Sequence, residues 1–89
     1  MSEIAIKYSL IWLSYAESDL HYMEKYAANA VKYNSNKFNS VAMQNEMLWF
    51  HRHLADACNE AVKLSKADRR AFNALHDELI EKERRILNM

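Results

Sequence analysis

The sequence contains no glycine and no proline among its 89 residues, although average usage would supply roughly ten. Glycine tolerates positive φ and allows the backbone to approach a ligand closely. Phosphate-binding loops, dinucleotide fingerprints, nucleophile elbows and standard EF-hand loops therefore depend on it, and so do tight two-residue hairpins. The composition excludes these kinds of site and favours an all-helical chain.

Cysteine, net charge and long apolar runs are scarce as well. The single cysteine, Cys58, cannot form an intramolecular disulfide or a Cys-x-x-Cys site, which suits a reducing compartment. Twelve Lys and Arg balance twelve Asp and Glu, so no charged tail directs the chain to a polyanion. Signal-peptide features and a membrane-spanning apolar run are both missing. We expect a cytoplasmic protein with no membrane association.

Apolar residues recur three or four positions apart in three segments, which predicts helices over residues 3–33, 40–64 and 66–87. The third helix is expected to bury Phe72, Leu75, Leu79 and Ile86, with Lys82 interrupting the stripe. Asn and Ser concentrate in the breaks at 34–40 and 64–66. Because these residues cap helices without left-handed reversals, we expect the connections to need no glycine.

Short connections between amphipathic helices predict one domain, an elongated antiparallel three-helix bundle. A helix of about 30 residues is about 45 Å long, which is too long for a compact globule of this size. The first helix also carries a wider apolar arc than two narrow-striped partners require. We therefore expect self-association, as a homodimer.

Tyrosine gathers along one edge of the first helix. Tyrosine combines a large rigid contact area with a hydroxyl that seeks water or a partner, and aromatic residues are enriched at interfaces. We interpret this edge as an oligomer or partner interface, the alternative being an ordinary core edge with solvated hydroxyls. Its members are Tyr8, Tyr15, Tyr22, Tyr26 and Tyr33.

Asp19 lies on the apolar arc of the first helix, where a carboxylate must be paired, hydrogen-bonded or protonated. We expect it to accept a tyrosine hydroxyl or a basic group from a neighbouring helix, with ligand binding or acid–base chemistry as the alternative.

Trp49 projects from the second helix beside Arg52, His53 and Asp56. Tryptophan beside arginine is typical of a partner-binding surface, unless another helix covers it.

Metal and nucleic-acid binding are not expected. His51 and His53 point about 200° apart on a helix, and His51 lies two turns from Cys58. We expect no metal and no cofactor, and we interpret Cys58 as a small buried hydrophobe. Basic residues on the third helix alternate with acids, which is typical of a solvated surface rather than a phosphate-binding stripe.

The string Trp-Leu-Ser-Tyr-Ala-Glu-Ser-Asp-Leu at 12–20 resembles the opening helix of HEPN domains. That resemblance implies an all-helical, often dimeric fold and an RNase or RNA-binding function. The catalytic Arg and His of the family would correspond to Arg69 or Arg70 and to His76.

The sequence favours a non-catalytic binding, adaptor or inhibitor protein that contacts another protein through helix faces. Regulators and phage-encoded inhibitors are common among small helical proteins of this kind. Two alternatives remain: the HEPN-like RNase or RNA-binding module, and an oligomer that binds a small ligand between subunits, with the tyrosine edge and Asp19 as its pocket.

Overall fold

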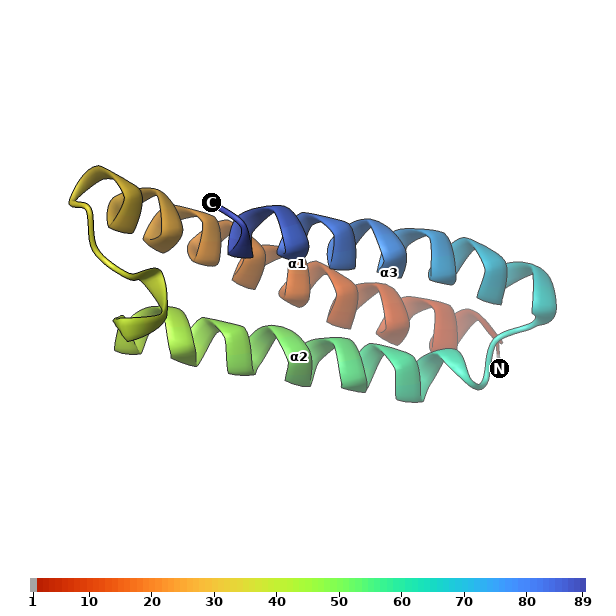
Figure 1. Cartoon of the computed structure of the whole chain (residues 1–89). Coiled ribbons are helices and arrows are strands. Elements are labelled where there is room, and N and C mark those ends of the chain that lie inside the picture. Colours follow the sequence, from red (N-terminus) through yellow and green to blue (C-terminus); the bar gives the residue numbers. More distant parts are fainter. Residues whose placement is uncertain (1) are drawn as a thin grey trace.

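Three long helices make up the protein in the computed structural model, which describes residues 2–89 (Figure 1). Helix α1 spans Ser2–Lys32, α2 spans Val41–Ala61 and α3 spans Lys66–Leu87, and a short 3-10 helix, η1, covers Lys37–Asn39. The molecule measures 49 × 19 × 13 Å. The predicted all-α, elongated antiparallel three-helix bundle is confirmed. Within the described residues, no helix has the continuous apolar length that a bilayer crossing requires.

Helix α1 lies between the other two helices (Figure 1). It packs along α2, which runs antiparallel to it, and along α3, which runs parallel to it, whereas α2 and α3 touch each other at few points. The bundle is therefore open on the side where α2 and α3 would otherwise meet. Every large contact in the fold involves α1.

Alanine allows α1 and α2 to approach closely. In a chain without glycine, alanine is the smallest side chain left and also the best helix former. Ala16 and Ala27 of α1 and Ala57 and Ala61 of α2 are all fully buried. Larger side chains fill the spaces between these contacts and complete a continuous core: Leu13, Leu20, Met23, Met43, Phe50, Leu54, Phe72, Leu79 and Ile86.

Serine side chains begin the second and third helices. The Ser40 hydroxyl accepts the backbone N–H of Met43 at 3.2 Å. The Ser65 hydroxyl accepts the backbone N–H of Asp68 at 3.3 Å and donates to the Asp68 carboxylate at 2.9 Å. Each satisfies a backbone donor that would otherwise lack a partner. Helix α2 ends at Ala61, earlier than the predicted residue 64, because residues 62–64 form a turn.

The end of α1 contradicts our expectation that the connections avoid left-handed backbone. Asn34 adopts a φ of 53°. The backbone N–H of Ser35 donates to the carbonyl of Ala30 at 2.9 Å, and that of Asn34 donates to Val31 at 3.2 Å. This is a Schellman motif, in which glycine usually occupies the left-handed position. Asparagine takes its place here because it tolerates this conformation better than most residues.

Helix α3 is rotated relative to the predicted stripe. Phe72, Leu79 and Ile86 are buried as expected, but Leu75 is 42% exposed. The polar residue that enters the stripe is Glu83, which is 8% exposed, and Lys82 is exposed. The reason is a contact with α2, where His51 Nε2 lies 2.6 Å from Glu83 Oε2. Apolar spacing alone cannot reveal such a partner.

We expect Asn34→Gly to stabilise the protein and Asn34→Ala to destabilise it. Alanine in the left-handed conformation costs roughly 1–2 kcal/mol, whereas glycine adopts it without that cost. A change of 1 kcal/mol moves the melting temperature of a domain this small by about 4–8 °C. Thermal unfolding followed by circular dichroism measures both changes. Asn36→Gly, two residues away, is the control; equal shifts from both glycine substitutions would contradict the explanation.

Candidate functional site

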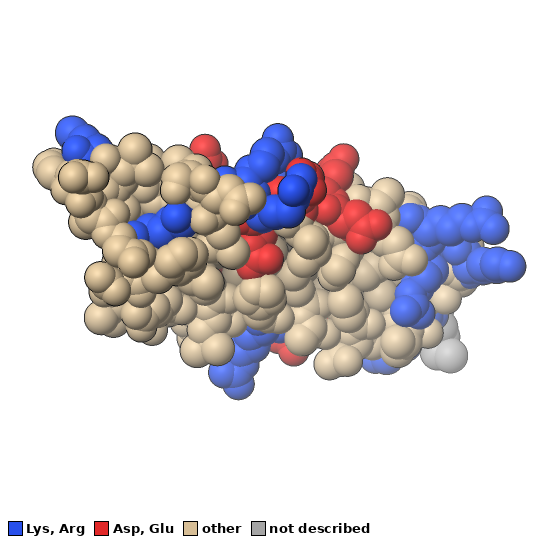
Figure 2. All heavy atoms as spheres, viewed as in Figure 1, with Lys and Arg blue, Asp and Glu red and all other residues tan. Residues whose placement is uncertain are grey.

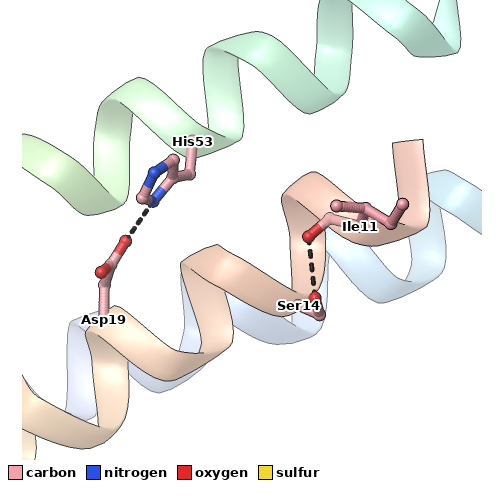
Figure 3. Close-up of polar contacts among 4 residues, drawn as sticks. All are labelled: Ile11, Ser14, Asp19 and His53. Carbon is pink, nitrogen blue, oxygen red and sulfur yellow. Dashed lines mark hydrogen bonds and ion pairs between the residues drawn. The ribbon is translucent and has the colours of Figure 1, made fainter. Parts of the chain in front are cut away.

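A carboxylate and an imidazole join α1 to α2 near the middle of the bundle. Asp19 Oδ2 lies 2.5 Å from His53 Nδ1, and Figure 3 shows the two side chains pointing toward one another from facing helices. Asp19 is only 9% exposed. A carboxylate at this depth requires a hydrogen-bonding partner, and His53 supplies it. A short contact of this kind is typical of a charge-assisted hydrogen bond.

Two tryptophans stack on the same imidazole. The ring centroids of Trp12 and Trp49 lie 5.8 and 5.7 Å from that of His53, with interplanar angles of 22° and 26°. Tyr15 approaches the same cluster, at 5.6 Å from both His53 and Trp12. Because Asp19 holds the imidazole, it also fixes the rings that stack on it. Aromatic contacts at such distances contribute beyond the area they bury.

Glu46 adds a second carboxyl group beside Asp19. Its partial burial raises the pKa of Glu46 above the ordinary value, and the neighbouring Asp19 charge raises it further, while His53 opposes these effects. Two carboxyl groups close together disfavour ionisation of both. The cluster therefore contains two neighbouring carboxyl groups, those of Asp19 and Glu46, beside the single imidazole of His53.

The cluster opens onto an aromatic surface along the outer side of α1 and α2. Tyr8, Tyr15 and Tyr22 lie seven residues apart on α1 and so share one side of the helix. Each is about half exposed, and Trp49 is 47% exposed. We call this surface the aromatic face; it comprises Tyr8, Trp12, Tyr15, Tyr22, Trp49 and His53.

Four other residues predicted for the tyrosine edge or for the surface around Trp49 lie outside the aromatic face: Tyr26, Tyr33, Arg52 and Asp56. Tyr26 is partly buried against the core, and Tyr33 lies beyond the end of α1, where it is 71% exposed. The Arg52 guanidinium carbon lies 5.6 Å from the Trp49 ring centroid. Asp56 is half-buried, and His53 turns inward to Asp19 rather than outward with Arg52.

The residues implied by the HEPN resemblance all lie on α3. Arg69 and Arg70 are exposed. His76 contacts the Phe72 ring at a centroid distance of 6.0 Å, and its Nδ1 lies 3.5 Å from the Asp77 carboxylate. An RNase or RNA-binding role for these residues stays a prediction.

Charges of both signs mix on the face that includes α3. Figure 2 shows Lys and Arg gathered at the end where α3 begins, with acidic and basic side chains side by side over its middle. Arg84 and Glu81, for example, form a bidentate pair on the surface. Within the residues that the structure describes, no group of three or more His, Cys, Asp or Glu is arranged to hold a metal ion. Cys58 is a free, half-buried thiol packed against the core.

Glu46 and Trp12 belong to this cluster, although neither was predicted as a site residue from the sequence. A signal was present, because Trp12 and Asp19 are seven residues apart on one helix, as are Glu46 and His53 on the other. Heptad spacing places each pair on one side of its helix. The spacing does not show that these two sides face each other.

Comparison of this chain with protein-family models, with curated proteins and with solved structures finds no match.

We expect His53→Ala to destabilise the protein by about 1–3 kcal/mol, because the substitution leaves the buried Asp19 carboxylate without its hydrogen-bonding partner. Urea unfolding followed by circular dichroism measures the loss. Leu48→Ala, at a position 64% exposed on the same helix, is the control and should change stability by less than about 0.5 kcal/mol. Equal effects of the two substitutions would show that Asp19 does not depend on His53.

We expect Glu46→Gln to stabilise the protein at pH 7. The pKa of Glu46 is raised above 4.5 in the folded state, so the folded protein binds this proton more tightly than the unfolded chain does. Stability therefore falls as pH rises from 4.5 through the folded pKa, and at pH 7 the ionised group opposes folding. The advantage of Glu46→Gln should shrink as the pH falls below 4.5. Melting temperatures of both proteins from pH 3 to 8 test this, and a constant difference would contradict it.

Proposed function

We propose that this protein is a non-catalytic binding protein, a homodimer that contacts a partner protein through the aromatic face. The observation that carries the proposal is the stack of Trp12, His53 and Trp49. Asp19 holds this stack through its hydrogen bond to His53, and Trp49 and Tyr15 remain about half exposed.

The fixed rings suit recognition because side chains that are already ordered lose little entropy on binding. Tryptophan, tyrosine and arginine also carry a large share of the energy at protein interfaces. Arg52 completes this combination beside Trp49. The partner we propose presents an apolar surface that covers Trp49 and Tyr15, with acceptors for their polar edges.

The absence of glycine supports a role on helix surfaces. The connections between the helices are short and contain Asn and Ser, and none offers a glycine-rich loop that would cradle a phosphate or position a nucleophile. An adaptor or an inhibitor that blocks its partner fits this arrangement equally.

A photo-crosslinking amino acid at position 15 tests the proposal in the cells that encode the protein. We expect position 15 to give a covalent adduct with one partner protein, and position 62 to give none. Val62 is the matched control because it is 63% exposed but lies in the turn that follows α2, outside the aromatic face.

Trp49→Ala should weaken capture of that partner by about thirtyfold, the effect of losing an interface residue worth roughly 2 kcal/mol. Leu48→Ala should leave capture unchanged. Adducts of equal yield from positions 15 and 62, or capture that is indifferent to Trp49→Ala, would overturn this use of the aromatic face.

A further inference from the structure

A groove runs along the opposite side of α1, between α1 and α3. It consists of three adjoining hollows of about 180, 410 and 350 Å³. The first two share Glu17 and Lys82, and the last two share Met89. Lys37 donates to the backbone carbonyl of Met89 at 2.9 Å and so holds that residue in place. The two hollows that share Glu17 and Lys82 lie between α1 and α3, and the third continues past the end of α3 beside the connection from α1 to α2.

The floor of this groove is apolar. Leu13, Leu20, Leu79 and Ile86 line it and are largely buried beneath it. Leu10 and Leu75 stand on its two sides and are 44% and 42% exposed. An apolar strip flanked by polar residues is typical of an interaction surface.

The two rims of the groove carry opposite charges. Glu17 and Glu24 lie on the α1 rim, and Lys82 and Arg85 lie on the α3 rim. Among the described residues, the ion pairs of this chain leave all four of these side chains unpaired. Ser14 and His21 of α1 and Glu78 of α3 also line these two hollows. Apart from Glu78 on α3, the groove therefore presents an acidic α1 rim and a basic α3 rim to whatever covers it.

We propose that this groove is the surface through which two copies of the chain dimerise, an inference that rests on the homodimer proposed above. A twofold axis parallel to the helices places α1 of each copy opposite α3 of the other. Glu17 and Lys82 line the same hollows and so lie at one height along the bundle. Glu17 of one copy then faces Lys82 of the second copy, and Leu10 faces Leu75.

The charges select this arrangement over the other twofold one. An axis across the helices places α1 against α1, which brings the two acidic rims together, and like charges in contact oppose association. The parallel arrangement joins each acidic rim to a basic rim. It also assembles α1 and α3 of both copies into four adjacent helices, a common bundle geometry. The aromatic face on the other side of α1 stays free for the partner protein.

Charge reversal tests the inference through the mass in solution, measured by size-exclusion chromatography with light scattering. We expect the wild-type chain to have the mass of a dimer. Glu17→Lys alone and Lys82→Glu alone should each raise the dimer dissociation constant by about tenfold or more, because each creates like-charged contacts across the interface. An equimolar mixture of the two variants should recover the dimer, since each copy then meets opposite charges. Recovery of the dimer on mixing is expected only if position 17 of one copy contacts position 82 of the other.

Trp49→Ala is the control and should remain a dimer. A wild-type monomer would overturn both the homodimer and the groove, while crosslinking at position 15 would still test the partner. A dimer that persists in both charge variants, or one that Trp49→Ala disrupts, would leave the homodimer in place and overturn the groove. Circular dichroism of each variant shows whether it is folded, and failure of the folded variants to recover a dimer on mixing would also contradict the inference.

Discussion

The packing of both other helices on α1 is the constraint on which the rest of the structure depends. Helices α2 and α3 scarcely touch each other, so each gains most of its burial from one side of α1. This arrangement gives α1 two outer edges, each beside a different neighbour. The aromatic face lies along the edge with α2, and the apolar groove lies along the edge with α3. The wide apolar arc of α1 thus serves two internal contacts and two exposed surfaces.

Histidines of α2 connect it to both neighbours. His51 and His53 point to nearly opposite sides of the helix, which is why they cannot share a metal ion. The same divergence brings His53 to Asp19 of α1 and His51 to Glu83 of α3. Each of these two buried carboxylates has one nearby imidazole. Polar contacts of this kind favour one alignment of neighbouring helices over sliding of one along the other, because a shift would leave a buried charge without its partner.

The sequence predicted the helices because local spacing encodes them, and the serine residues before α2 and α3 marked their starts. It did not predict the rotation of α3. Glu83 enters the core in response to His51, a residue far away in sequence, and no local pattern contains that information. The same limit applies to the site: the position of Asp19 on an apolar arc indicated that it needs a partner, but only the packing of α1 on α2 identifies His53. Asn34 shows a different limit. Its left-handed backbone directs the N–H groups of Asn34 and Ser35 to the carbonyls of Val31 and Ala30, and the spacing of apolar residues does not predict this kind of helix end.

The sparse contact between α2 and α3 has a consequence for how the molecule opens. Helix α3 is attached through one stripe on α1 and through the His51–Glu83 contact, whereas α1 and α2 share the alanine-rich core. Segments with fewer buried contacts open at lower free energy than the whole fold. The molecule is therefore a helical hairpin with a third helix attached to one side. Its amide protons should exchange in two groups, those of α3 through detachment of that helix and those buried between α1 and α2 through unfolding of the hairpin.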